Sequence, residues 1–117
     1  MPLIKVQTSV AGPDQDTVTT LLKTLSASLA QQLGKSESYV MTAFEGDVPM
    51  TMAGSTEPSC YIEIKSVGTM GADKTKAMSQ AFCQQVETSL GIAGDRIYLF
   101  FSDVPGSMWG WNGRTFG

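Results

Sequence analysis

The second residue of the chain, Pro2, carries a secondary α-amine once Met1 is removed. An α-amino group titrates at about 7.7–8.0 in peptides. Burial in an apolar pocket beside another cation lowers its pKa further, because both disfavour the charged form. Such an amine is a free base at neutral pH and a candidate for proton-transfer chemistry. Retention of Met1 would turn the nitrogen of Pro2 into a tertiary amide with no basic lone pair, so the hypothesis requires Met1 to be removed.

The composition excludes most other kinds of catalytic site. The chain has no histidine, which rules out a His-based triad, a His general base and most zinc sites. Its two cysteines, Cys60 and Cys83, are too far apart for a CxxC redox pair and too few for a four-cysteine site. We interpret both as small core residues. We therefore expect chemistry that uses neither a metal nor a cofactor.

Length and charge narrow the class of protein. A chain of 117 residues that is 42% hydrophobic predicts one domain over residues 1–117 with its own core. The net charge of -3, with scattered Lys and Arg, favours small-molecule or protein partners over nucleic acid. No apolar run is long enough to span a membrane, and the N-terminus lacks the regions of a signal peptide. We expect a cytoplasmic protein, or one secreted without a signal peptide, and no membrane partner.

The elements that would position Pro2 are visible in the hydrophobic pattern. Ile4 and Val6 alternate with polar residues, which predicts a strand that starts at Pro2. Gly12-Pro13-Asp14 predicts a turn into a helix that ends at Gly34. The apolar stripe of this helix consists of Val18, Leu21, Leu22, Leu25, Leu29 and Leu33. A second strand is predicted over about Ser38 to Glu45.

The same pattern returns in the second half of the chain. A predicted strand over Cys60 to Val67 leads to a helix that opens at Gly71-Ala72-Asp73 and closes at Gly91. A final strand is predicted over Arg96 to Ser102. The loop before this unit, 47–59, is rich in Pro, Gly and Met.

The two halves, about residues 1–46 and 58–103, predict a duplicated β-α-β unit. The expected fold class is α/β (α+β): a four-stranded mixed sheet with two helices on one face. The other face, which we expect to carry Tyr39, Met41, Tyr61 and Phe100, would be left open. An apolar open face predicts that another subunit covers it.

Several separated motifs stand in one order along essentially the whole chain. They are Met1-Pro2, Leu33-Gly34-Lys35 with Tyr39, Ser55-Thr56-Glu57-Pro58, Lys65-Ser66-Val67-Gly68, Asp95-Arg96-Ile97-Tyr98, Gly110-Trp111-Asn112 and Thr115-Phe116. Together they resemble the macrophage migration inhibitory factor family of the tautomerase superfamily, and are also similar to D-dopachrome tautomerase. The resemblance implies a homotrimer whose three sheets form a barrel around a solvent channel, with an active site at each subunit boundary.

The resemblance also implies an activity. It is keto-enol tautomerisation of a small aromatic 2-keto acid such as phenylpyruvate, or dopachrome isomerisation, with Pro2 as general base and acid. Lys35 matches the family's lysine, which holds a substrate oxygen and disfavours protonation of the proline amine. The implied substrate-binding residues are Ser66, Val67 through its backbone, Tyr98 from a neighbouring subunit, Phe100, and the aromatic wall of Tyr39 and Trp111. Phe100 stands where the best-known member has an asparagine, which implies a more apolar pocket.

The residues by themselves leave alternatives open. Lys35 also fits an ordinary solvated cation at a helix end, and Tyr98 and Trp111 also fit core or interface aromatics. The family includes a cytokine, so a cytokine-like signalling protein with vestigial catalysis and an unknown receptor is the alternative function. Hydrolytic dehalogenation needs arginines around the base, and Arg96 and Arg114 show no match to that arrangement. A purely structural trimer is the third alternative.

Overall fold

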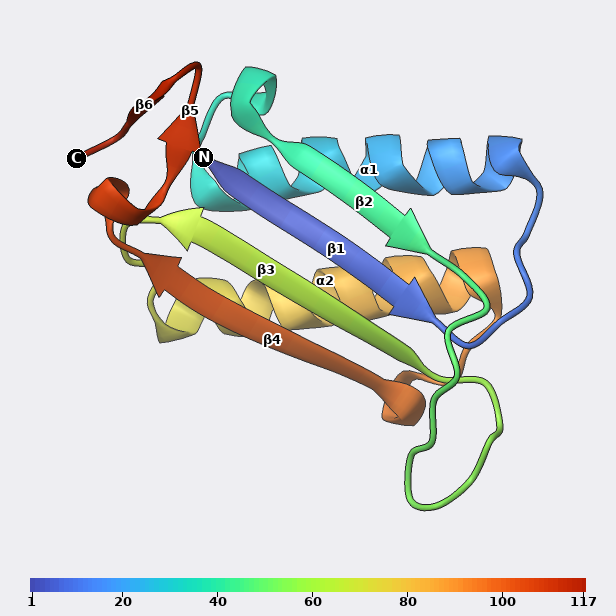
Figure 1. Ribbon diagram of the computed structural model, residues 1–117. Coiled ribbons are helices and arrows are strands. Elements are labelled where there is room, and N and C mark those ends of the chain that lie inside the picture. The colour runs from blue at the N-terminus through green and yellow to red at the C-terminus, as the bar shows by residue number, and fades with distance from the viewer.

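The computed structural model describes residues 1–117 as a four-stranded sheet with two helices on one face (Figure 1). The strands are β1 (Pro2–Thr8), β2 (Met41–Glu45), β3 (Cys60–Val67) and β4 (Ile97–Val104). The helices are α1 (Gln15–Leu33) and α2 (Ala72–Leu90). The sheet order is β2-β1-β3-β4, with β1 parallel to β2, β3 parallel to β4, and β1 antiparallel to β3. Each half of the chain thus forms one β-α-β unit, as the sequence predicted.

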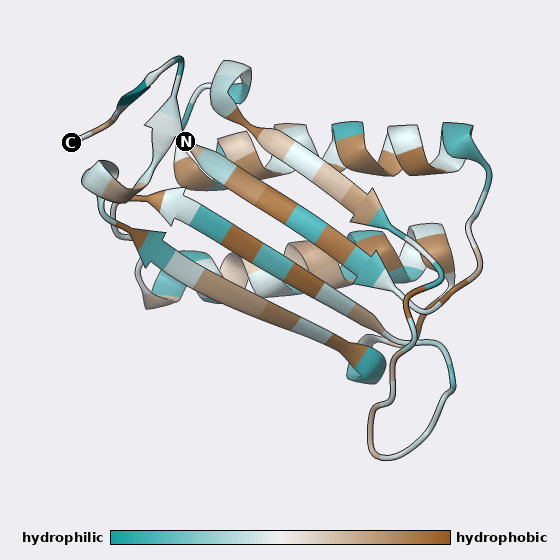
Figure 2. Ribbon diagram, in the orientation of Figure 1, coloured by the Kyte–Doolittle hydropathy of each residue, from teal (hydrophilic) through white to brown (hydrophobic).

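Alternation along the two central strands creates the core between sheet and helices. In β1 and β3 every second residue is buried, so apolar and polar bands alternate along both strands (Figure 2). Ile4 and Ile64 lie opposite each other in register, and both are 0% exposed. They pack with apolar residues of both helices, which include Leu25, Leu29, Met78, Phe82 and Val86.

Both helices begin and end close to the residues predicted from sequence. A carboxylate oxygen of Asp14 accepts a hydrogen bond from the backbone N–H of Thr17 at 2.8 Å, which caps α1. α1 ends at Gly34 and α2 at Gly91, each in the left-handed conformation, with φ of 64° and 70°. Glycine tolerates this conformation because it has no Cβ. Gly34 therefore sets the direction in which the chain leaves α1 toward Lys35.

The predicted bounds of two strands, β2 and β4, are wrong. Tyr39 does not lie in a strand with Met41; it ends a short 3₁₀ turn, η1 (Glu37–Tyr39), because the hydroxyl of Ser36 accepts a hydrogen bond from the backbone of Ser38 at 3.3 Å. β2 therefore starts only at Met41, and Tyr39 is not on the open face of the sheet. The last strand begins at Ile97 and not at Arg96, which belongs to the turn η2 (Gly94–Arg96).

The residues after β4 are ordered against the end of the sheet that carries the N-terminus (Figure 1). A short turn, η3 (Gly106–Met108), leads into a hairpin of β5 (Gly110–Trp111) and β6 (Arg114–Thr115). Asn112 and Gly113 form its two-residue turn with φ of 51° and 77°, the signature of a tight hairpin. This hairpin brings the C-terminal aromatic residues close to Pro2.

The loop 47–59 lies at the opposite end of the sheet (Figure 1). The guanidinium of Arg96 holds it in place by donating hydrogen bonds to four backbone carbonyls, those of Met52, Ser55, Glu57 and Pro58. No helix in the chain combines the length and apolar character that crossing a membrane requires.

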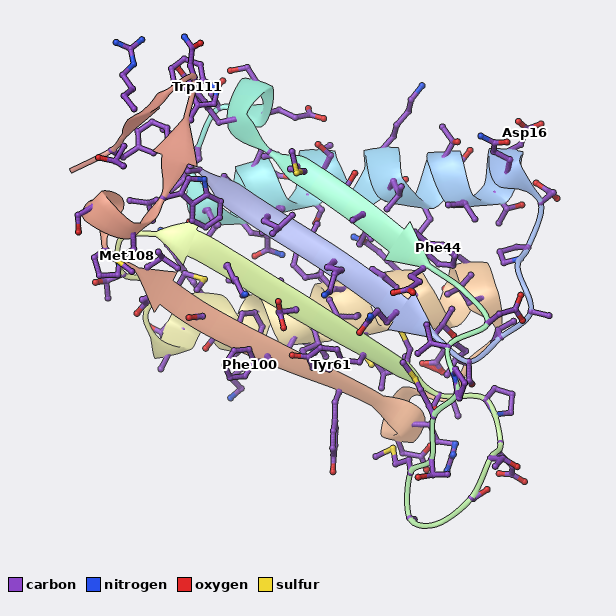
Figure 3. The ribbon with its side chains drawn as sticks, in the orientation of Figure 1. Asp16, Phe44, Tyr61, Phe100, Met108 and Trp111 are labelled. Carbon is purple, nitrogen blue, oxygen red and sulfur yellow. The ribbon has the colours of Figure 1, made fainter.

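The face of the sheet opposite the helices is uncovered within one chain. It presents Met41 on β2, Tyr61 on β3 and Phe100 on β4, with Met41 66% and Phe100 51% exposed. Figure 3 shows Tyr61 and Phe100 on neighbouring strands of this face. Polar side chains share it: the hydroxyl of Tyr61 donates to Glu63 at 2.8 Å, and Glu63 pairs with Lys65 at 3.1 Å.

We predict that Phe82→Ala lowers the free energy of unfolding by about 3–5 kcal/mol. Phe82 is 0% exposed at the centre of the core, so the substitution leaves a cavity that the surroundings fill only in part. Denaturant unfolding at one fixed protein concentration measures the loss. Gln84→Ala, at an exposed position of the same helix, is the control and should change stability by no more than about 0.5 kcal/mol. Equal effects of the two substitutions would contradict the assigned core.

Candidate active site

The N-terminal strand begins inside the protein. Pro2 is buried and pairs in antiparallel register with Ser66, near the end of β3. Side chains directly opposite in such a pair have Cβ atoms about 4.5–5.5 Å apart. A pocket of about 350 Å³ opens beside this pair. Its lining consists of Met1, Lys35, Ser36, Tyr39, Val67 and Phe116.

The ammonium of Lys35 is bound to the same end of β3. The chain leaves α1 at Gly34, and the backbone N–H of Lys35 still bonds to the carbonyl of Ala30 at 2.9 Å. From there Nζ of Lys35 donates to the carbonyl oxygen of Val67 at 2.5 Å and to Oγ of Ser66 at 3.0 Å. An ammonium has three N–H donors. One donor is therefore left for an anionic oxygen in the pocket.

This environment favours the uncharged form of the terminal amine. With Met1 present, the pKa of its amino group lies below the usual 8.0, first because of burial and second because of the positive charge of Lys35. The pKa of Lys35 is also lowered, by burial and by the charge of Lys74. An amine with a lowered pKa is a free base over more of the neutral range. Removal of Met1 would place the amine of Pro2 in the same surroundings.

Tyr39 and Phe116 are the aromatic residues of the pocket lining, and Trp111 packs against both without lining the pocket itself. The rings of Tyr39 and Trp111 meet edge to face with centroids 5.5 Å apart. Trp111 stacks on Phe116 at 5.9 Å, and the guanidinium of Arg114 lies 5.6 Å from the Trp111 ring. Figure 3 shows Trp111 on the hairpin at the N-terminal end of the sheet. Such an aromatic cluster suits a planar or aromatic ligand.

Apart from Met1, two of the lining residues are not among the predicted site residues. Ser36 and Phe116 line the pocket, but neither was predicted as a site residue. Phe116 belongs to the motif Thr115-Phe116, which contributes to the family resemblance but does not indicate that Phe116 lines the pocket. The backbone N–H of Phe116 bonds to the carbonyls of Gly106 and Trp109. The hairpin thereby brings Phe116 back to the pocket that Lys35 lines.

Two predicted site residues lie elsewhere in the single chain. Tyr98 pairs in register with Tyr61 toward the other end of the sheet from Pro2, and its side chain is 67% exposed. It lines a separate pocket of about 330 Å³ beside the loop 47–59. Phe100 lies between these ends, opposite Glu63. One chain therefore assembles Pro2, Lys35, Ser66, Val67, Tyr39 and Trp111, but not Tyr98 and Phe100.

The cysteines are unsuited to act as nucleophiles. Burial first, and the neighbouring Cys83 second, raise the pKa of the Cys60 thiol to about 12. Burial also raises the pKa of Cys83. A thiol with a raised pKa carries little thiolate at neutral pH.

Solved structures with the same architecture define the class of protein. A macrophage migration inhibitory factor homologue from Prochlorococcus marinus is 50% identical, with a TM-score of 0.93 over 98% of this chain and 99% of that one. Macrophage migration inhibitory factor of Toxoplasma gondii is 29% identical, with a TM-score of 0.92 over 97% and 99% of the two chains. The two-layer duplicated β-α-β arrangement is thus the tautomerase-superfamily fold.

Sequence comparison gives the family. The sequence model described as macrophage migration inhibitory factor (MIF) matches residues 1–117. A macrophage migration inhibitory factor homolog of Trichuris trichiura is 34% identical over 99% of this chain and 100% of its own length. The macrophage migration inhibitory factor of Meriones unguiculatus is also 34% identical, over 99% of both chains. The chain belongs to the macrophage migration inhibitory factor family, which confirms the resemblance recognised from its motifs.

We predict that Lys35→Met raises the pKa of the terminal amine. The substitution removes the positive charge, which is the second cause of the lowered pKa, but leaves burial, so the pKa should move only part of the way to 8.0. NMR titration of protein whose N-terminal residue has been established by intact mass measures the pKa. Lys23→Met removes the same charge from the exposed surface of α1 and should leave the titration unchanged. A pKa unaffected by Lys35→Met would contradict the electrostatic coupling.

Proposed function

We propose that the protein is a cofactor-independent keto-enol tautomerase that acts on phenylpyruvate-like 2-keto acids, with the amine of Pro2 as general base and acid. The observation that carries the proposal is the location of the N-terminus. With Met1 present, this residue lines an apolar pocket beside Lys35, and burial and Lys35 lower the pKa of its amino group. Family membership supports an isomerase, and the site's geometry supports this particular chemistry.

The proton-transfer step needs only groups that the pocket supplies. After Met1 is removed, the nitrogen lone pair of Pro2 takes a proton from the carbon next to the substrate's carbonyl group. The electron pair of the broken C–H bond moves to the carbonyl oxygen and forms an enolate. The protonated amine then delivers the proton to that oxygen, which gives the enol and regenerates the base. A base with a pKa near the working pH is the most effective catalyst for such a transfer.

Lys35 stabilises the charge that develops during this step. Its ammonium is already held by Ser66 and Val67, so it needs little rearrangement to meet an anion. Its remaining N–H donor would bind the substrate's carboxylate or the enolate oxygen. Tyr39, with Trp111 packed against it, would hold the substrate's ring. In this proposal Val67 contributes its backbone, and its carbonyl keeps Lys35 in place.

We also propose that three chains assemble with their open sheet faces inward. This arrangement would bury Met41 and Phe100, and it would bring Tyr98 of one chain toward the Pro2 pocket of its neighbour. The support is the position of Tyr98 and Phe100, which are exposed and cannot reach Pro2 within one chain. The polar side chains of Glu63 and Lys65 on the same face favour a water-filled centre over a dry interface.

A cytokine-like role is the second candidate function. It is favoured by the names of the relatives, since macrophage migration inhibitory factor is named for an effect on cells. Such a role would require release from the cell and an unidentified receptor.

We predict that Pro2→Ala lowers kcat/KM for phenylpyruvate at least tenfold, a loss of about 1.4 kcal/mol of transition-state stabilisation. The variant keeps a terminal amine but loses the ring that fixes its nitrogen. Protein that retains Met1 should be inactive, because the nitrogen of Pro2 is then an amide. The measurement is enol-keto conversion by protein of known intact mass.

The matched control for this prediction is Pro49→Ala. Pro49 is exposed in the loop at the other end of the sheet, so its replacement should leave the rate unchanged. Equal rates for Pro2→Ala and the unmodified protein would overturn the tautomerase assignment.

We predict that Met41→Glu breaks the assembly into single chains. The unmodified protein should have three times the 12.5 kDa mass of one chain in sedimentation equilibrium. A carboxylate at Met41 would be buried without a partner in the proposed interface, which is strongly unfavourable. Gln31→Glu adds the same charge on the exposed surface of α1 and should leave the trimer intact. A monomeric unmodified protein would contradict the proposed assembly.

A further inference from the structure

Ser66 stands out among the residues around the pocket because its polar group is buried. Its side chain is only 1% exposed, and it does not line the pocket that Lys35 lines. It faces the helix layer together with Ile62 and Ile64, since residues two apart on a strand share a face. A hydroxyl in this position has little access to a bound substrate, although Ser66 is one of the predicted substrate-binding residues.

The partner of this hydroxyl is the ammonium of Lys35. Oγ of Ser66 accepts from Nζ of Lys35 at 3.0 Å, whereas the contact between Oγ and the Val67 carbonyl, at 3.5 Å, is at the limit for a hydrogen bond. The main interaction of the Ser66 hydroxyl is therefore with a charged donor. Such charge-assisted bonds are stronger than bonds between neutral groups.

Two acceptors hold Lys35 more firmly than one. A lysine side chain has a flexible four-carbon stem and would otherwise move among many rotamers. The Val67 carbonyl and the Ser66 hydroxyl belong to consecutive residues at the end of β3, so together they define the position of Nζ. Ser66 is also the residue opposite Pro2 in the β1–β3 pairing. The same strand pair therefore fixes both the terminal amine and the acceptor that holds the nearby cation.

We propose that Ser66 is a positioning residue, whose hydroxyl holds the ammonium of Lys35 beside the terminal amine. In this role Ser66 does not touch the substrate and acts only through Lys35. The catalytic meaning of this role rests on the proposed function, but the positioning itself is a property of the unliganded protein. It can therefore be tested without turnover.

The test is a double-mutant cycle read by NMR titration of the terminal amine. Ser66→Ala should raise the midpoint, by less than Lys35→Met does, because Lys35 then keeps only the Val67 carbonyl as acceptor and its charge is held less firmly beside the amine. Adding Ser66→Ala to Lys35→Met should change nothing further, since the residue through which Ser66 acts is gone. The charged groups that act on this cluster are Lys35 and, through Lys35, Lys74.

The cycle separates positioning from a general structural effect. An unchanged midpoint in Ser66→Ala would overturn the proposal, and so would an equal shift in the presence and absence of Lys35. Ser66→Cys, which keeps a similar size but offers only a weak acceptor, is the second variant if Ser66→Ala does not fold, and should shift the midpoint in the same way. Lack of phenylpyruvate turnover in the unmodified protein would contradict the proposed function but would leave this titration readable.

Discussion

The antiparallel pairing of β1 with β3 is the constraint on which the site depends. It starts at the second residue of the chain, so the N-terminus is held inside the protein and not left free at the surface. The pairing of Pro2 with Ser66 then places the terminal amine beside the end of β3, where Lys35 is bound. α1 supplies Lys35 because Gly34 ends the helix and turns the chain toward this edge. The N-terminus is thus fixed by the backbone pairing of two strands, and Lys35 by one helix end and two hydrogen bonds to the end of β3.

The burial of the amine and the charge of Lys35 act in the same direction. Each disfavours a positive charge on the terminal nitrogen, so each lowers its pKa. The same lysine is available to an anionic substrate. Its positive charge disfavours protonation of the amine but attracts a carboxylate. In the proposed function, one ammonium therefore both keeps the base unprotonated and attracts the 2-keto acid. This double use is how the proposal accounts for proton transfer at neutral pH by a chain without histidine.

Local patterns predicted most of the fold because the relevant signals are short-range. The alternation in β1 and β3, the cap at Asp14 and the glycines at both helix ends act within a few residues of each other, and each is where the sequence placed it. The failure at Tyr39 has the same origin, since a hydrogen bond from Ser38 to Ser36 outweighs the β-propensity of an aromatic residue. Pro2 was proposed as the base from its position after Met1, and Lys35 was proposed from the family resemblance. Phe116 was not proposed, because its place in the pocket depends on a hairpin that returns the C-terminus to the first strand. The distance of Tyr98 from Pro2 was likewise invisible without the register of β3 and β4.

The most direct test of the central claim is the pH dependence of kcat/KM for phenylpyruvate, measured on protein from which Met1 has been fully removed. The acidic limb of this profile reports the pKa of the base in the free enzyme. We expect activity to fall as the pH decreases through a single midpoint below 8.0, because the amine of Pro2 would take the surroundings in which burial and Lys35 lower the pKa of the Met1 amine. A profile that is flat through the neutral range, or one with its midpoint above 8.0, would contradict the assignment of the terminal amine as the base.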